Sequence, residues 1–270
     1  MVSGVRAASA VTRTEWCLRI GAAACFIGHG AFGVMTKEAW VSYFAVVGMN
    51  RDVAYALMPV VGMVDIAAGI IALLSPRPIV LWYMAVWAVW TATLRPLAGE
   101  SFFETLERAG NYGVPIAFLV LSRARLGRRD LFRRLQVSEL ADRATAGRVL
   151  LWTTATLLFA HGALQTITGK PMFGAHYAAI DLPASVVPMA GSIEMFVAVA
   201  VLVVPVPALL VAIAAWKLAT EALFPISGAP IWEFVERAGS YAAPLALAAL
   251  VVVPLTRNRV TRPSDPVRAA

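Results

Sequence analysis

Charged residues are scarce in this chain of 270 residues, at 14% of the sequence, whereas soluble domains carry about 25%. Hydrophobic residues make up 60%, and the mean hydropathy is +0.73. This composition excludes an ordinary soluble domain and predicts an all-α integral membrane protein. The first 13 residues are polar and mildly basic and lead directly into a full apolar span. That layout does not fit a cleavable signal peptide.

Cysteine is also scarce, and several catalytic motifs are missing. Cys17 and Cys25 are the two cysteines, and they lie about 12 Å apart along one predicted helix, too far for a disulfide. The chain has no CxxC, so we do not expect a thiol-redox enzyme of the vitamin K epoxide reductase type. It also has no GxGxxG, Walker loop, GxSxG or CxxCH. We expect no soluble catalytic domain, and the sequence does not decide whether the protein is an enzyme.

The net charge of +7 does not point to nucleic acid, because the basic residues are clustered. They collect near the N-terminus, at 123–134 and at 257–268. Such clusters mark cytoplasmic ends and loops of membrane proteins. We therefore expect a multi-pass protein of the bacterial cytoplasmic (inner) membrane with both termini cytoplasmic. Its expected partners are the lipid bilayer and a redox partner protein, without nucleic acid.

An internal repeat is the most informative feature of the sequence. Residues 99–115 read GESFFETLERAGNYGVP and 228–244 read GAPIWEFVERAGSYAAP, at a constant spacing of 129. IGHG at 27–30 matches FAHG at 159–162 at a spacing of 132, so about three residues are missing from a loop of the second copy. A duplication allows the two copies to be compared with each other. Polar residues kept in both copies become candidates for function.

Apolar runs long enough to cross a bilayer occur four times in each copy. Four crossings return the chain to its starting side, so the copies are expected to be parallel, related by a pseudo-twofold axis along the membrane normal. We expect a surface or re-entrant segment at 37–56, a loop at 171–183 and a capping box formed by Ser101 and Glu104. Pro230 is expected as a first helical residue. The expected spans are 16–35, 57–74, 79–94, 108–121, 149–169, 186–204, 207–224 and 238–254.

The predicted organisation has four parts. Residues 15–122 form the first four-helix repeat and 148–255 form the second. Residues 123–147 form a basic, amphipathic, cytoplasmic linker, which we expect at the membrane surface. Residues 256–270 form a basic cytoplasmic tail.

Several polar residues fall inside the expected spans. His29 and Asp65 lie at nearly the same depth, as do His161 and Glu194 in the second copy. Charged groups at such depth are costly and normally face a bundle interior or a wet cavity. A histidine beside a buried carboxylate can relay protons, ligate a metal or hydrogen-bond a quinone carbonyl, and packing between helices is the structural alternative. No HxxxH or HxxE spacing supports a metal, so we expect none.

Further charged residues lie near the outer ends of the spans. Lys217 and Glu221 are four residues apart on one helical face, and the first copy has Ala88 and Ala92 in their place. Each copy also carries E-x-x-E-R before its last span. The first Glu and the Arg of that motif can form a helix-start ion pair, or the Arg can bind an anion at a cavity mouth. These residues are Glu104, Glu107 and Arg108, and Glu233, Glu236 and Arg237.

Each copy resembles the DoxX-like family of bacterial four-helix membrane proteins. The likeness rests on LRIG at 18–21, on Gly28-His29-Gly30, and on a loop with an aromatic residue and a glycine. It continues with a proline and G-x-x-D/E at 62–65 and 191–194. Asp65 stands where that family usually has Glu. The resemblance implies a four-helix bundle per copy and an association with thiosulfate:quinone oxidoreductase subunits or with oxidative-stress complexes.

Three functions follow as alternatives. The leading one is binding of a quinone, the possible cofactor, or of another small amphiphile in a polar, outward-opening cavity, as a membrane subunit of a redox system. The second is transport of a small solute or a proton. The third is a non-catalytic scaffold for a partner protein. If one copy holds the site, Lys217 and Glu221 favour the second copy. The cavity is expected around His29, Asp65, Arg108, His161, Glu194, Lys217 and Arg237.

Overall fold

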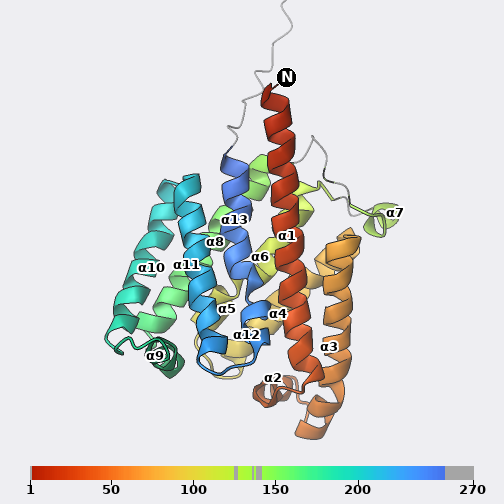
Figure 1. Cartoon of the computed structure of the whole chain (residues 1–270). Helices are drawn as coiled ribbons and strands as arrows, with labels where there is room; N and C mark the ends of the chain where they lie inside the picture. Colours follow the sequence, from red (N-terminus) through yellow and green to blue (C-terminus); the bar gives the residue numbers. More distant parts are fainter. Residues whose placement is uncertain (1, 125–126, 136, 138–141, 253–270) are drawn as a thin grey trace, which may run out of the picture.

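A computed structural model describes residues 2–124, 127–135, 137 and 142–252, which form helices, turns and loops without any strand. The chain is thus all-helical (Figure 1). The tail at 256–270 lies outside the described residues. The helices, with the 3-10 turn η1, are α1 (Val2–Val34), η1 (Glu38–Trp40), α2 (Val41–Val46), α3 (Arg51–Leu74), α4 (Pro78–Leu97), α5 (Phe103–Glu107), α6 (Ala109–Leu121), α7 (Arg128–Leu131), α8 (Arg143–Thr166), α9 (Pro171–Ala178), α10 (Val186–Val203), α11 (Pro207–Ile226), α12 (Ile231–Glu236) and α13 (Ala238–Val251).

Four helices in the described part of the chain are long and apolar enough to cross a membrane. They are Ser9–Val34 within α1, and α3, α10 and α11. Helix α6 is apolar but has only 13 residues. The predicted membrane protein is therefore supported in its coarse form by helix length and composition.

Local sequence explains where several long helices begin. Pro78 and Pro207 occupy the first positions of α4 and α11, where the missing N–H of proline is not needed. Asn50 caps α3 by accepting a hydrogen bond from the Val53 backbone N–H at 3.0 Å. Asp142 caps α8 through the Thr145 N–H in the same way. These caps satisfy backbone groups that a helix start leaves unpaired.

The helices of the two halves are interleaved. Helix α1 packs on α3 of its own half, and α8 packs on α10. In addition, α1 packs on α12 and α13 of the second half, and α8 packs on α5 and α6 of the first half. Figure 1 shows the blue C-terminal helices beside the red α1. Neither half is therefore a bundle that stands alone.

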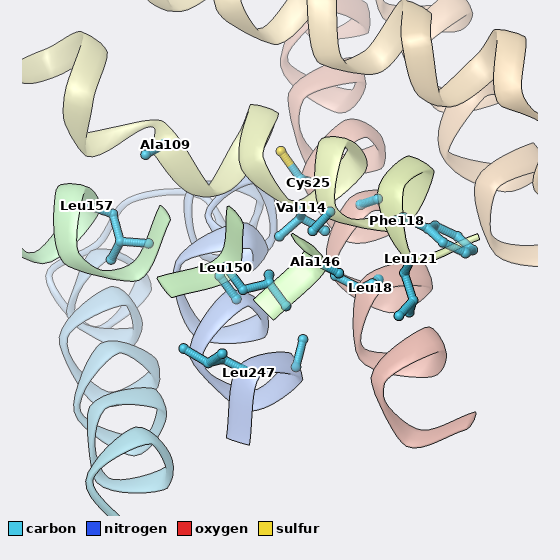
Figure 2. Close-up of a cluster of buried hydrophobic side chains, with 14 of the residues drawn as sticks. Leu18, Cys25, Ala109, Val114, Phe118, Leu121, Ala146, Leu150, Leu157 and Leu247 are labelled. Atoms are coloured by element: carbon cyan, nitrogen blue, oxygen red, sulfur yellow. The ribbon is translucent and has the colours of Figure 1, made fainter. Parts of the chain in front are cut away.

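The core lies where these four helices meet. Figure 2 shows Leu18 of α1 close to Phe118 and Leu121 of α6, with Leu150 of α8 and Leu247 of α13 nearby. All five side chains are almost fully buried. Burying each such side chain stabilises the fold by about 1.5–3 kcal/mol in a soluble protein. Here the same packing joins the first half to the second.

Short helices gather at one end of the bundle. Helices α2, α5, α9 and α12 lie at the lower end of Figure 1, while the start of α1, the end of α13 and α7 lie toward the other end. The described part of the linker contains the short α7 and, from Arg143, the first residues of α8, but no amphipathic helix along its length. This segment contacts the α3–α4 turn, because the Leu135 N–H donates to the Pro76 carbonyl at 2.8 Å.

The structure corrects four local predictions. The expected loop at 171–183 contains α9, and the expected surface segment at 37–56 ends early because α3 begins at Arg51. Ser101 and Glu104 form no capping box: the Ser101 hydroxyl accepts from the Phe103 N–H, while Glu104 binds cationic side chains. Pro230 is the N-cap of α12, one position before the expected one.

Candidate functional site

In the first half, a histidine, an aspartate and two aromatic side chains form a hydrogen-bonded group. His29 Nδ1 lies 2.9 Å from Asp65 Oδ2. The Tyr83 hydroxyl donates to Asp65 Oδ1 at 2.8 Å, and Trp87 Nε1 donates to Asp65 Oδ2 at 3.3 Å. The Asp65 side chain is completely buried. These bonds satisfy a carboxylate that is costly to bury without partners.

A close crossing of two helices brings this group together. A Cβ built on Gly30 of α1 would lie 2.5 Å from the Gly62 carbonyl oxygen, and one built on Gly62 of α3 would lie 2.4 Å from that of Gly30. Two glycines thus let the backbones of α1 and α3 approach closely. His29 and Asp65 are next to this crossing, within one helical turn of the glycines. The glycines therefore set the distance between the two polar side chains.

The second half has the corresponding arrangement. His161 Nδ1 lies 2.5 Å from Glu194 Oε2, and Trp216 Nε1 donates to Glu194 Oε1 at 2.6 Å. Gln165 donates to Glu194 Oε2 at 3.0 Å and supplies the third contact, because Ala212 stands at the position of Tyr83. Gly162 and Gly191 cross closely here as well.

Arginines and glutamates of both halves form an ion-pair network. Glu236 Oε1 lies 3.1 Å from Arg108 Nη1 and 3.0 Å from Arg237 Nη1, so it joins the two arginines. The expected pairing four residues apart occurs between Arg237 and Glu233, at 2.5 Å. In the first half Arg108 instead pairs with Glu107 at 3.1 Å. That part of the prediction is wrong because partners from the other half compete for each side chain.

Neighbouring charges decide the ionisation of the two buried glutamates that precede these arginines. Burial opposes the charged form, but Arg108 and Arg237 outweigh it and lower the pKa of Glu107 to about 2. For Glu236, burial likewise opposes the charge, and the same two arginines hold the pKa below its ordinary range. Both carboxylates are therefore ionised at neutral pH.

Two lysines that the sequence analysis missed extend this network across the halves. Lys37 Nζ lies 2.5 Å from Glu233 Oε1, and Lys170 Nζ lies 2.5 Å from Glu104 Oε1. Each lysine follows the histidine-bearing helix of one half and binds the E-x-x-E-R segment of the other. The sequence feature that could have identified them is a single lysine eight residues after His29 and nine residues after His161.

Lys217 and Glu221 form the expected ion pair, which is buried. Nζ lies 2.8 Å from Glu221 Oε1, and the side chains are 1% and 0% exposed. This distance is short enough for an ion pair, but the orientation of Nζ does not meet the angles of a hydrogen bond. Arg237 Nε lies 3.3 Å from Glu221 Oε2, and the Ser240 hydroxyl donates to Glu221 Oε1 at 3.2 Å. Glu221 is thus shared by two cations.

A cavity of about 380 Å³ lies in the first half, between α2, α3 and α4. His29 is at its wall with a side chain 22% exposed, whereas Asp65 lies behind it. The polar side chains at the cavity are few: His29, Tyr43, Thr91, Arg95, Arg108 and Asn111. The apolar and aromatic wall includes Trp40, Phe44, Met49, Leu57, Met58, Val61, Trp87, Trp90 and Leu94.

The expected single polar cavity is therefore wrong in two respects. His161 and Arg237 border a separate space of only about 10 Å³ in the second half, and the larger cavity is mostly apolar. Ala88 and Ala92 line the open cavity, and Lys217 and Glu221 take their places in the second half. Both longer side chains are buried. The expectation that the second copy holds the site is not supported by this geometry.

His176 is the third histidine of the chain, and the sequence analysis assigned it no role. It lies on α9, buried against Phe224 with ring centroids 4.3 Å apart. Burial, assisted by the charge of Arg237, lowers the pKa of His176 to about 4. The side chain is therefore neutral at pH 7.

Within the described residues, no three or more His, Cys, Asp or Glu side chains are grouped so that they could hold a metal ion. Comparison of the chain with protein-family models, with curated proteins and with solved structures finds no match. The fold and the apolar helices define the class of the protein: it is all-helical, with four helices suited to crossing a membrane. Its activity has to be inferred from the cavity and the polar groups around it.

Proposed function

We propose that the chain crosses the bacterial inner membrane eight times, as two parallel four-helix repeats with both termini and the linker cytoplasmic. The spans would be α1, α3, α4 and α6, then α8, α10, α11 and α13. The histidine–carboxylate–tryptophan contacts that recur in both halves support a pseudo-twofold relation along the membrane normal. We also propose membership of the DoxX-like family, on the motifs quoted above.

The proposed function is binding of a quinone or another small amphiphile, as a membrane subunit of a redox system. The single observation that carries it is the cavity beside His29. Ligand sites are concave and mostly apolar, with a few placed polar groups. Three tryptophans at the wall suit a flat ring, because stacked and edge-to-face contacts add to apolar burial. The wall includes side chains of α3 and α4, two of the proposed spans, which supports entry of a ligand from the bilayer.

A cavity-filling substitution tests this proposal. Ala88→Leu adds three carbon atoms at the cavity wall, and we expect it to weaken binding of a short-chain ubiquinone analogue by about tenfold or more. Ala219→Leu on the exposed face of α11 is the matched control and should bind like the wild type. Binding is measured by quenching of tryptophan fluorescence and by thermal stabilisation in detergent, with the unliganded melting temperature as the folding control. Equal binding by both variants, or no binding of either the quinone or its hydroquinone by the wild type, would contradict the proposal.

Transport of a small solute or a proton stays a second candidate, because buried charges run continuously from Lys217 through Glu221 and Arg237 to Glu236. Charged groups of this kind mark ion and proton pathways in membrane proteins. Flux into liposomes that is abolished by Glu194→Gln would favour transport. The scaffold alternative predicts that the buried polar residues are dispensable and that the basic linker is not.

A further inference from the structure

His29 presents one edge of its ring to Asp65 and the other to the cavity. Nδ1 faces Asp65, whose side chain is fully buried and does not line the cavity. Nε2 is on the ring edge away from Nδ1, and the imidazole is at the cavity wall. Among the described residues, no group forms a hydrogen bond with Nε2, whereas Nδ1 is paired. A ligand in the cavity meets this nitrogen.

The surroundings of Asp65 decide which nitrogen of His29 carries the proton. The indole N–H of Trp87 is a donor only, and it points at the same carboxylate oxygen as Nδ1. The Tyr83 hydroxyl donates to the other oxygen. An ionised carboxylate accepts hydrogen bonds and cannot donate them. For a neutral imidazole beside an ionised carboxylate, Nδ1 carries the proton and Nε2 is left as an acceptor.

Three other polar side chains of the cavity already have partners, whereas the Asn111 amide, also at the wall, forms no side-chain hydrogen bond with the described residues. The Thr91 hydroxyl donates to the Trp87 carbonyl at 3.0 Å. The guanidinium of Arg95 binds Glu100, and that of Arg108 binds Glu107 and Glu236. Nε2 of His29 is thus an acceptor open to a ligand, beside the Asn111 amide. Trp40 lies against the same imidazole, with ring centroids 4.5 Å apart and planes inclined by 32°, so an aromatic wall stands beside this acceptor.

Building on the proposed function, we propose that the cavity selects the hydroxyl form of an aromatic ligand. A phenolic O–H, as in a hydroquinone, donates to His29 Nε2 while the ring lies among Trp40, Trp87 and Trp90. A quinone carbonyl or a methyl ether has no proton to donate. Its oxygen would be an acceptor placed against another acceptor, His29 Nε2. A site built for a hydrogen bond rejects an analogue that cannot make it, because a polar group is left unpaired.

The experiment compares three probes with the same alkyl chain: a hydroquinone, its dimethyl ether and the corresponding quinone. Affinities for the full chain in detergent are measured by isothermal titration calorimetry without oxygen, so that the hydroquinone stays reduced. We expect the hydroquinone to bind at least about tenfold more tightly than the ether or the quinone, which corresponds to about 1.4 kcal/mol. His29→Phe should remove this preference. His161→Phe is the matched control and should retain it, because His161 does not line the large cavity.

The possible outcomes separate this inference from the proposed function. If none of the probes binds the wild type, the proposed function fails. If all three bind equally, or the quinone or the ether binds best, ligand binding stands but the selection by His29 is overturned. The same holds if His29→Phe keeps the preference. The wild-type comparison needs no variant, so it decides the matter even if His29→Phe does not fold.

Discussion

Two alanines and two charged residues at corresponding positions explain why only one half has an open cavity near its histidine. Ala88 and Ala92 have the smallest side chains after glycine, so space remains beside His29. Lys217 and Glu221 stand at the corresponding positions of the second half, and burying either charge alone would cost several kcal/mol. They are buried together, with Arg237 as an additional partner. The duplication has thus produced a ligand-sized space in one half and a buried, charged interior in the other.

The lowered pKa of His176 on α9 makes the stability of the fold depend on pH. His176 has a folded pKa of about 4, and an ordinary histidine has a pKa near 6.5. Between these pH values the unfolded chain binds a proton that the folded protein does not. Stability is therefore complete above about pH 6.5 and is lost as the pH falls towards 4.

The variant His176→Gln measures this contribution. We expect its melting temperature in detergent to fall less between pH 7 and pH 4.5 than that of the wild type. Glu107 and Glu236 respond to pH alike in both proteins, so the difference isolates His176. A measurement of both proteins at pH 8 controls for lost packing, because the histidine is neutral in both states there. The assignment is wrong if the two proteins lose stability in parallel.

At the scale of helices, glycine contacts control the geometry of the polar groups. Helices α1 and α3 meet at Gly30 and Gly62, and α8 and α10 meet at Gly162 and Gly191. Each contact is between backbones, which cannot move aside as a flexible side chain can. A methyl group added there must separate two helices that are packed along much of their length.

Gly30→Ala tests this element. We expect a loss of about 1–3 kcal/mol, as for other overpacked sites, because the new Cβ would lie 2.5 Å from a backbone oxygen. Gly147→Ala on α8 adds the same methyl group where no atom lies within 4 Å. It should be neutral or stabilising by up to about 1 kcal/mol, because alanine favours a helix more than glycine does. Melting curves in detergent compare the two variants. Equal effects would show that the crossing tolerates the methyl group.

The sequence predicted the long helices better than the short ones. Runs of about 20 apolar residues, bounded by prolines and turns, placed α10 and α11 to within two residues. Helix α9 was predicted as a loop because eight residues give a weak periodic signal. The start of α3 was missed because its first turn is polar and is ordered by the cap at Asn50.

At the scale of the molecule, ion pairs and packing tie the halves together. Lys37 and Arg108 bind glutamates of the opposite half, and so does Lys170. Gly110 and Gly239, which are 129 residues apart in sequence, contact each other backbone to backbone. Corresponding residues meet in this way when they lie next to an axis that relates two copies. We therefore regard the protein as one interleaved body built from two copies.

Cysteine labelling tests the proposed topology. In a background with Cys17→Ala and Cys25→Ala, single cysteines are placed at the exposed positions Ser42, Ser227 and Phe132. A membrane-impermeant maleimide should label Ser42→Cys and Ser227→Cys in intact spheroplasts. It should label Phe132→Cys only after permeabilisation. Opposite labelling of Ser42→Cys and Ser227→Cys would contradict parallel copies, because the segment after the first span of copy one and the segment after the third span of copy two are proposed to lie on the same outer side of the membrane.

The sequence by itself determined which polar residues belong together. Composition predicted the membrane class, and comparison of the two copies selected the histidines, the carboxylates and the Glu-Arg segments. These inferences need no structure, because hydropathy and a duplication are properties of the chain alone. Helical spacing also predicted the pairing of Lys217 with Glu221, which needs no other helix.

Only the tertiary structure decided which carboxylate each arginine contacts and where the cavity lies. Glu236 binds arginines of both halves, and Lys37 and Lys170 reach across to the other copy. Such choices depend on the close approach of helices that are distant in sequence. The cavity depends on the volume left after all side chains are packed. The spacing of residues along the chain specifies neither the contacts between distant helices nor the volume left between them. For this physical reason the cavity in the first half could not be predicted.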